Sequence, residues 1–463
     1  MKNIILIVTD TFRYDNLGSR AERTVRTPQL DKFAKKRATS IEDFYTGSFP
    51  TIPHRTDLAS GVLGWPHYGW QPIQQSGPNH VGEMLGEEGY ATQLICDCPH
   101  LFNSGFQFDF DGAFQNRGQE GDKPLLHLND PVKEAMPHDK TRMEPTFRGH
   151  PLVDQHRWIN RYFQLEEETF PAQTGGTAVR WLEENYQAEP FFLWVDFFDP
   201  HEPWDPPEYL ADRYHPEYEG RPMIHPNYGR SEDYTEEELR NLWAHYAAEA
   251  ELVDRHIGRI LQKIDDLRLW KDSVVLITSD HGASLGEHER TGKSNINEGD
   301  DRYWPIYPEV GHVPFLIAGE GIPQGARRKA IGQPVDILPT LSELAEVNLE
   351  GEKELQGRSL APLIKGEEES GREYAVSGSY LDPEGEDGRL PSCSVTPFLV
   401  TEEWGYAPVG AEREPELYRL QNDPLAKEDL ARGNDETLAE LDRLFLTHLE
   451  ESGAAEDFLK LWR

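Results

Sequence analysis

The stretch Ile4-Ile5-Leu6-Ile7-Val8-Thr9-Asp10-Thr11 decides the fold, because it is a short, unbroken apolar run that ends in polar residues. Such runs are typical of strands that are buried on both faces of a parallel sheet. Ligands of open α/β sheets collect at the carboxyl ends of the strands, which is where Asp10 lies. The alternative is an aspartate that only caps the turn after the strand. We interpret Asp10 as a candidate site residue.

The same apolar pattern returns along the chain and alternates with helical patterns. Further buried strands are expected at residues 91–96, 190–196, 273–278 and 313–318. Helices are expected at residues 80–90 and 177–186, the latter entered through Gly175-Gly176, and a long helix follows the capping box at residues 235–238. Strands that alternate with helices predict an α/β protein whose mostly parallel sheet is covered by helices on both faces.

The chain divides into a large part and a small part. Residues 1–350 carry the α/β pattern, so we expect them to form the main domain. Residues 349–372 are charged and rich in Glu and Gly, which favours a linker. Residues 373–463 carry short strand-like runs and a final helix from about Asp435, which predicts a small C-terminal subdomain with antiparallel strands. Segments 102–155 and 205–234 have irregular patterns and are expected to shape the pocket.

The charge balance excludes two classes of partner. The chain of 463 residues has 46 Lys and Arg against 83 Asp and Glu, which gives a net charge of −37. A surface of this sign repels nucleic acid and anionic membranes. Lysine is scarce, and an acidic, lysine-poor composition resembles that of halophilic proteins from a salt-rich cytosol, although an ordinary acidic enzyme is the simpler alternative.

The cysteines and the apolar runs indicate the compartment. The three cysteines, Cys96, Cys98 and Cys393, cannot form a disulfide framework, and Cys96 and Cys98 lack the second pair that a zinc site needs. A strand pattern begins at Asn3, which leaves no room for a signal peptide. The longest apolar runs are far shorter than the ~20 residues that span a bilayer. These features predict a cytoplasmic protein.

The stretch Ser48-Phe49-Pro50-Thr51-Ile52-Pro53-His54-Arg55 holds a hydroxyl residue in a stiff turn. The two prolines restrict the backbone around Thr51. Residues 56–61 are expected to begin a helix, whose N-terminus would favour an anion near the hydroxyl. Arg55 adds a planar set of donors that suits a tetrahedral oxyanion. The alternative is a proline-rich surface turn.

A divalent metal site is expected where two strands end. Asp10 follows the first strand, and Asp280-His281 follows the strand at residues 273–278. Two carboxylates, an imidazole and the Thr51 hydroxyl form a ligand set that suits Mn²⁺, Mg²⁺ or Ca²⁺. Such an ion lowers the pKa of a hydroxyl and polarises an ester oxygen. We therefore expect one divalent ion held by these four residues.

These motifs, taken together and in this order, resemble the sulfatase family of the alkaline-phosphatase-like superfamily. The likeness covers nearly the whole chain. It rests on residues 7–13, Thr27-Pro28-Gln29-Leu30-Asp31, Thr51-Ile52-Pro53-His54-Arg55, Asp199-Pro200-His201-Glu202-Pro203, Thr278-Ser279-Asp280-His281-Gly282, Gly286-Glu287-His288, Gly292-Lys293, Val335-Asp336-Ile337-Leu338-Pro339-Thr340 and the tail at residues 416–424. The resemblance implies an alkaline-phosphatase-like α/β/α sandwich and hydrolysis of a small anionic ester.

The resemblance also implies roles for single residues. Asp10, Asp280 and His281 match metal ligands, and Thr51 matches the nucleophile. Arg55 would hold the nucleophile and the metal-bound oxygens and, with Lys293, the anion. His201 would protonate the leaving oxygen, and His100 matches a histidine that follows the family's Gly-Lys pair. By themselves, Lys293 could simply be solvated and His201 could simply brace a proline-rich turn.

The chain departs from the family pattern at three positions. Family members generally carry Cys or Ser at the position of Thr51, and that residue is oxidised to formylglycine. Threonine cannot give an aldehyde by this route, because its β-carbon bears a methyl group. The second metal aspartate of the family is replaced by Thr11, and the Gly-Lys pair by Asp97-Cys98. These changes predict a leaner metal shell and one cationic contact fewer.

The expected reaction is hydrolysis of a sulfate ester or a phosphate-type ester at a Thr51–metal centre. The family resemblance favours sulfate, whereas a threonine nucleophile favours phosphoryl chemistry, so the heteroatom stays open. One alternative is a two-metal phosphodiesterase or phosphotransferase in which Asp199, His201 or His312 holds a second ion. The other alternative is a non-catalytic binding protein on a sulfatase scaffold.

Overall fold

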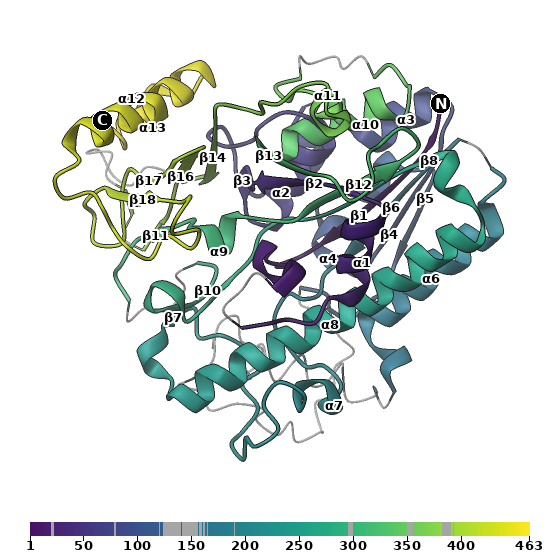
Figure 1. Ribbon diagram of the computed structural model, residues 1–463, viewed down its shortest axis with the longest axis horizontal. Coiled ribbons are helices and arrows are strands. Elements are labelled where there is room, and N and C mark those ends of the chain that lie inside the picture. The colour runs from purple at the N-terminus through teal and green to yellow at the C-terminus, as the bar shows by residue number, and fades with distance from the viewer. Residues whose placement is uncertain are drawn as a thin grey trace.

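A computed structural model describes residues 1–19, 23–77, 80–119, 121–123, 140, 156, 160, 163, 165–188, 190–294, 300–349, 355–381, 390–391 and 393–463. Within them, an eight-stranded sheet with the strand order β13-β2-β12-β8-β1-β6-β4-β5 runs through the middle of the molecule (Figure 1). Its strands are β1 (Asn3–Thr9), β2 (Thr39–Phe44), β4 (Ala91–Cys96), β5 (Gly112–Gln115), β6 (Phe191–Phe197), β8 (Ser273–Ser279), β12 (Phe315–Gly319) and β13 (Arg327–Gly332).

Strand β1 lies at the centre of the sheet, between two parallel neighbours. Thr9 is in register with Phe197 of β6 on one side and with Ser279 of β8 on the other. The residues that follow β1 and β8 are Asp10 and Asp280, so parallel pairing brings both carboxylates to one edge of the sheet. The expected strand at residues 313–318 is present as β12, but it runs antiparallel to both β8 and β2.

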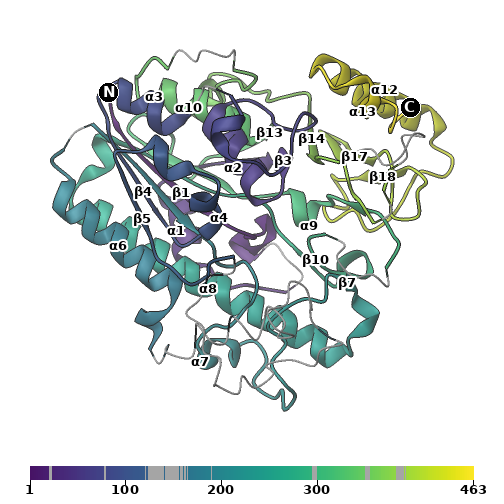
Figure 2. The same cartoon turned by 180° about the vertical axis from the view of Figure 1, so that it is seen from behind.

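Helices cover both faces of this sheet, which confirms the α/β/α sandwich. Ile4, Leu6 and Val8 of β1 pack on one layer of helices, and Ile5 and Ile7 pack on the other. The two layers lie on opposite sides of the sheet in Figures 1 and 2. The first layer contains α2 (Thr51–Ser60), α3 (Val81–Glu87), α4 (Pro99–Asn103), α10 (Ile337–Leu344) and α11 (Ala361–Lys365), and the second contains α1 (Pro28–Lys36), α6 (Phe170–Asn185) and α8 (Glu236–Asp266).

Two helices begin earlier than the sequence predicts. Helix α6 begins at Phe170, so Gly175 lies inside it rather than before it. A Cβ at Gly175 would lie only 3.0 Å from the Cβ of His256, so this glycine allows α6 and α8 to pack closely. Helix α2 begins at Thr51 itself rather than at residue 56, which places Thr51 in its first turn.

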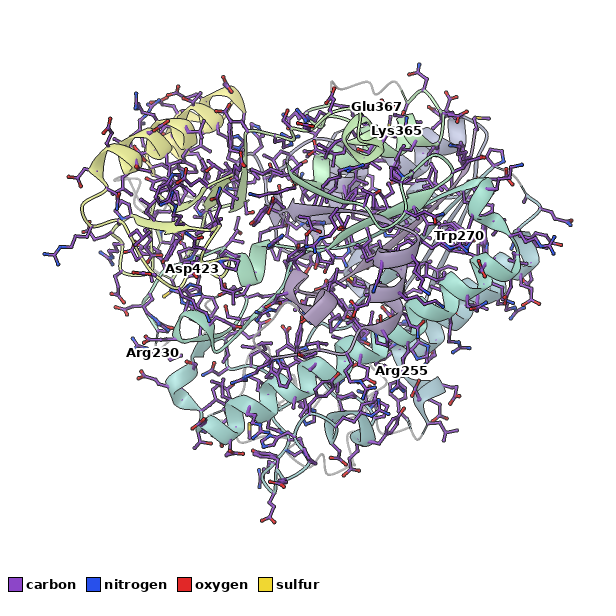
Figure 3. The ribbon with its side chains drawn as sticks, in the orientation of Figure 1. Arg230, Arg255, Trp270, Lys365, Glu367 and Asp423 are labelled. Carbon is purple, nitrogen blue, oxygen red and sulfur yellow. The ribbon has the colours of Figure 1, made fainter. Side chains whose placement is uncertain are left out.

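The C-terminal part forms a five-stranded sheet with the strand order β18-β17-β16-β14-β3. One of its strands comes from the N-terminal part of the chain, because β3 pairs in parallel with β14, with Ser48 opposite Gly378. Figure 3 shows Asp423 on the side of this subdomain that faces the main domain. The elements are β3 (Ser48–Phe49), β14 (Tyr374–Ser379), β16 (Phe398–Thr401), β17 (Trp404–Ala407), β18 (Glu416–Arg419), α12 (Asp435–Glu451) and α13 (Glu456–Leu459).

The prediction of a linker at residues 349–372 is wrong for the part of this range that the structure describes. Helix α11 lies there, and Leu360, Leu363 and Ile364 are buried in the same core cluster as β1. The short apolar run around Pro362 was masked by its charged neighbours. Of the segment at residues 102–155, which was expected to be irregular, the structure describes residues 102–119, 121–123 and 140. Strand β5 lies in this part and was not predicted. The rest of the segment lies outside the described residues.

The remaining short elements surround the carboxyl edge of the main sheet. Strands β7 (Gly229–Arg230), β9 (Ser284–Leu285) and β10 (Arg290–Gly292) form a small sheet in the order β7-β10-β9. Other short elements are α7 (Glu208–Ala211), β11 (Trp304–Pro305), α9 (Pro308–Gly311) and β15 (Val395–Thr396). In the part of the chain that is described, every helix is too short or too polar to cross a membrane.

Candidate active site

Asp10, Asp280 and His281 meet at the carboxyl ends of β1 and β8, as the sequence predicts. Each offers one ligand atom, and these atoms lie within 4.8 Å of one another. All three side chains are fully buried. Two carboxylates buried this close together repel each other, so a bound cation would stabilise the group.

His281 is oriented for metal binding. Its Nδ1 donates to the carbonyl oxygen of Gly282 at 3.0 Å, and the Nε2 lone pair has no hydrogen-bond partner among the residues that the structure describes. Nε2 lies 3.8 Å from Asp10 Oδ1 and 3.6 Å from Asp280 Oδ2. Burial lowers the pKa of His281 to about 3, with Lys293 adding to the effect, so the ring is neutral. Burial and Asp280 raise the pKa of Asp10. This donor set fits a divalent cation.

Arg55 holds the two carboxylates together. Its Nη1 lies 2.6 Å from Asp280 Oδ2 and 3.2 Å from Asp10 Oδ2. The same nitrogen donates to the carbonyl oxygen of Thr51 at 3.2 Å. The guanidinium is fully buried, so it acts on the carboxylates and on the first turn of α2. Arg55 therefore positions the centre rather than reaching out to solvent.

Asp196 is a site residue that the sequence analysis missed. It lies in β6, is fully buried, and accepts two hydrogen bonds of 2.9 Å from Arg55 Nε and Nη2. Trp194 Nε1 also donates to it at 3.1 Å. The available signal was an aspartate near the end of a strongly apolar strand, where Asp196 is in register with Val8 of β1.

Thr51 is the first residue of α2 and is 2% exposed. It follows Pro50, whose peptide bond to Phe49 is cis. The ring of Phe49 packs on the ring of His281 with a centroid distance of 5.0 Å. Together with the contact between Arg55 and the Thr51 carbonyl, this packing places Thr51 beside the metal ligands.

Thr11 replaces a metal ligand by a hydrogen-bond donor. Its hydroxyl donates to Asp10 Oδ1 at 2.9 Å, and its backbone N–H donates to Asp280 Oδ1 at 3.0 Å. Each metal carboxylate therefore has one oxygen bonded to Thr11.

Lys293 places a buried ammonium group beside Glu202. Its Nζ lies 3.5 Å from Glu202 Oε1, has no hydrogen-bond partner among the described residues, and the residue is 9% exposed. Glu202 also accepts a hydrogen bond from the hydroxyl of Tyr228. Lys293 lowers the pKa of His281, His201 and His100, in each case in addition to burial, which is the larger effect for all three.

His201 and His100 lie on either side of one phenylalanine. The His201 ring stacks on Phe198 at a centroid distance of 4.1 Å, and the His100 ring meets Phe198 edge-on at 5.7 Å. The Nδ1 of His201 donates to the carbonyl oxygen of Glu202. The half-exposed Trp70 meets the other side of His100 at 4.9 Å. The two histidines and Lys293 thus form one wall of the site.

His312, Asp199 and Asp97 contact other residues of the protein. His312 stacks between Tyr14 and Tyr45 at 3.8 and 4.5 Å, and its Nε2 donates to the Glu42 carbonyl. Asp199 accepts a hydrogen bond from Gln119, and burial with Asp97 raises its pKa. Asp97 accepts a hydrogen bond from Thr174 Oγ1 at 2.9 Å. Within the described residues, none of them belongs to a three-ligand group.

Comparisons with known proteins agree with the fold and identify the family. A model of the sulfatase family matches residues 2–347. An arylsulfatase of Clostridium perfringens is 25% identical over 480 residues, which cover 97% of this chain and 94% of that protein. Arylsulfatase K of Homo sapiens is 26% identical over 459 residues, which cover 91% of this chain and 77% of that protein.

Solved structures have the same fold. The phosphonate monoester hydrolase of Agrobacterium radiobacter gives a TM-score of 0.71 at 23% identity, covering 98% of this chain and 96% of that one. A 2-O GAG sulfatase gives a TM-score of 0.68 at 21% identity, covering 98% and 92%. Because the family model spans most of the sequence, from its second residue through α10, the chain belongs to the sulfatase family of ester hydrolases and has the alkaline-phosphatase-like fold.

Proposed function

We propose that this protein hydrolyses a sulfate ester or a phosphate-type ester with Thr51 as the nucleophile. One observation carries the proposal: Arg55 Nη1 bonds to the carbonyl oxygen of Thr51 and to both metal carboxylates at once. This contact fixes the first turn of α2 against the metal ligands. The relatives named arylsulfatase and the structural neighbour named phosphonate monoester hydrolase support both classes of ester.

The metal enters the proposal as a group that these residues would hold. Asp10, Asp280, His281 and the Thr51 hydroxyl would bind a divalent ion such as Ca²⁺, Mn²⁺ or Mg²⁺. When bound, it would lower the pKa of the Thr51 hydroxyl and polarise the ester. Arg55, held by Asp196, keeps the two carboxylates at the spacing that this binding needs.

Before the first step the Thr51 hydroxyl gives its proton to solvent, which its lowered pKa would allow. In the first step the Thr51 alkoxide attacks the sulfur or phosphorus atom, and the bond to the leaving alcohol breaks. The leaving oxygen takes a proton from His201, whose Nδ1 is fixed by the Glu202 carbonyl, so Nε2 delivers it. Burial and Lys293 lower the pKa of His201. An anionic ester bound beside Lys293 opposes both effects and favours the protonated ring.

In the second step water attacks the same sulfur or phosphorus atom and releases the Thr51 oxygen. His201, now neutral, takes the proton of the attacking water, which restores the protonated ring. A formylglycine hydrate releases its sulfate by reverting to the aldehyde, whereas a threonine ester lacks that exit. Hydrolysis through Thr51 therefore needs a site for this water opposite the threonine oxygen.

A panel of esters on metal-reconstituted protein tests the proposal. The panel contains a sulfate monoester, a phosphate monoester, a phosphate diester and a phosphonate monoester, all with the same aryl leaving group. Thr51→Val, which has the same shape without a hydroxyl, should abolish turnover of the preferred ester, and Thr51→Ser should keep part of it. Equal turnover by wild type and Thr51→Val on every ester would refute the proposal, and a wild type inactive on all four would favour a binding protein.

A further inference from the structure

A second group of potential metal ligands lies away from the catalytic centre. His80, Glu83 and Asp109 each offer one ligand atom, and these atoms lie within 4.8 Å of one another. We propose that these three residues bind a transition-metal cation, of which Zn²⁺ is the probe of choice, at a peripheral site that ties α3 to the segment before β5. The proposal does not depend on the catalytic role of Thr51.

His80 is oriented as a ligand by a backbone carbonyl. Its Nε2 donates to the carbonyl oxygen of Ile73 at 3.1 Å, so in the neutral ring the lone pair is on Nδ1. Nδ1 faces Asp109 Oδ2 at 3.4 Å, and the His80 side chain is 7% exposed. Metal-binding histidines typically donate their second ring N–H to a carbonyl or carboxylate in this way, which fixes the ring.

The backbone brings the other two ligands to the same place. His80 immediately precedes α3, and Glu83 is the third residue of that helix, so both lie in its first turn. Between them, Gly82 lies so close to η3 (Phe106–Asp109) that a Cβ would be 2.4 Å from the carbonyl oxygen of Asp109. Only a glycine allows this approach, and it delivers the Asp109 carboxylate to His80.

The ligand chemistry selects the ion. One imidazole nitrogen and two carboxylate oxygens suit Zn²⁺ or Mn²⁺, and three protein ligands completed by water are typical of Zn²⁺, whereas the catalytic group would add the Thr51 oxygen and so suit ions that prefer oxygen ligands. Asp109 has an 8% exposed side chain, while Glu83 is exposed, so the site opens to solvent on one side. An ion can enter there, and water can complete its coordination. The rival reading is an ion pair between protonated His80 and Asp109.

The test measures zinc bound by the whole protein after chelation, in the presence of excess Ca²⁺ or Mg²⁺ that occupies oxygen-rich sites. His80→Gln and Glu83→Gln should each bind about one zinc ion fewer per chain than wild type, or bind that ion at least about tenfold more weakly. Glu87→Gln is the matched control, because Glu87 lies one turn later on α3 and is also exposed. It should bind as much zinc as wild type.

The Asp280→Asn variant separates the two sites. It should lose binding at the catalytic group and keep the zinc ion that His80→Gln removes. Since Glu83 is exposed, its variant should fold normally even where His80→Gln does not. Equal zinc binding by wild type, Glu83→Gln and Glu87→Gln would overturn the proposal and leave the ion pair. Unchanged ester hydrolysis in Glu83→Gln is expected and would leave the proposed function untouched.

Discussion

Arg55 and Asp196 form two parallel hydrogen bonds of 2.9 Å, and both side chains are fully buried. This pair fixes the guanidinium plane, so that the remaining nitrogen, Nη1, contacts Asp10 and Asp280. A buried pair of this kind is a stronger constraint on geometry than a surface ion pair, because neither partner can turn to water.

Removing Asp196 should therefore damage both stability and catalysis. Asp196→Ala leaves a buried guanidinium without its main partner, and we expect a loss of about 3–5 kcal/mol in the free energy of unfolding. A shift of Arg55 by about 1 Å should lower kcat by about 100-fold. Urea unfolding and steady-state kinetics measure the two effects. Glu183→Gln, which removes the exposed pair with Lys263, is the control and should change stability by less than about 1 kcal/mol.

Chelation should destabilise the protein, because the cation offsets the repulsion between Asp10 and Asp280. For protein reconstituted with Ca²⁺ or Mg²⁺ at 100 times the dissociation constant, the bound ion contributes about 2.7 kcal/mol. Thermal unfolding with and without a chelator measures this difference as a lower Tm. In Asp280→Asn the chelator should have a smaller effect. A chelator shift of equal size in both proteins would show that the ion binds elsewhere.

His288 gives the protein a pH-dependent contribution to stability. Its Nδ1 lies 2.8 Å from Glu309 Oε1 and its Nε2 lies 2.7 Å from the carbonyl oxygen of Ala426. Both partners only accept hydrogen bonds, so both ring nitrogens must carry protons. Burial alone would lower the pKa of His288, but Glu309 outweighs it and the pKa is raised.

The sign of the effect follows from the raised pKa. The contribution of His288 is complete below the unfolded pKa of about 6.5 and is lost as the pH rises through the folded pKa. His288→Gln should therefore lower Tm more at pH 6 than at pH 9. His67→Gln, whose ring contacts the carbonyl of Ser452, is the control and should lower Tm equally at both values. A His288→Gln deficit that grows toward pH 9 would contradict the assignment.

A general acid protonates the leaving group, so the proposed role of His201 can be tested with esters whose leaving groups differ in acidity. His201→Gln should lower kcat by about 100-fold or more for an ester of a poorly acidic alcohol, and much less for a nitrophenyl ester. His100→Gln changes the wall of the site but should lower both rates by a similar factor. Steady-state rates on the two esters measure this. If His201→Gln lowered kcat by the same factor for both esters, His201 would not be the general acid.

The sequence predicts the centre of the fold well, because β1, β6 and β8 are buried on both faces and are unbroken apolar runs. Asp10 and Asp280 follow such runs directly, so they could be placed at one edge before the structure was known. The ion pair between Asp196 and Arg55 could not be predicted from the sequence, because it depends on β6 lying next to β1 in the sheet. The reversed direction of β12 also depends on neighbours far apart in the chain.

Other features depend on close packing, which periodicity does not reveal. Gly175 resembles a helix boundary in the sequence, but it is where α6 and α8 approach each other. The apolar residues of α11 are few and lie among charged ones, so a helix that fills the core resembled a linker. The roles proposed for Lys293 and His201 rest on the family resemblance, because each is an ordinary polar residue in its local sequence.

Strand β3 belongs to the C-terminal sheet, yet the next residues are Pro50 and Thr51. The last quarter of the chain is therefore not an independent module that evolution or an engineer can exchange freely. A chimera that takes its C-terminal subdomain from a relative would also receive a new partner for the strand that leads into Thr51, the nucleophile that we propose. Such a chimera would keep Asp10, Asp280 and His281 and could still misplace the Thr51 oxygen.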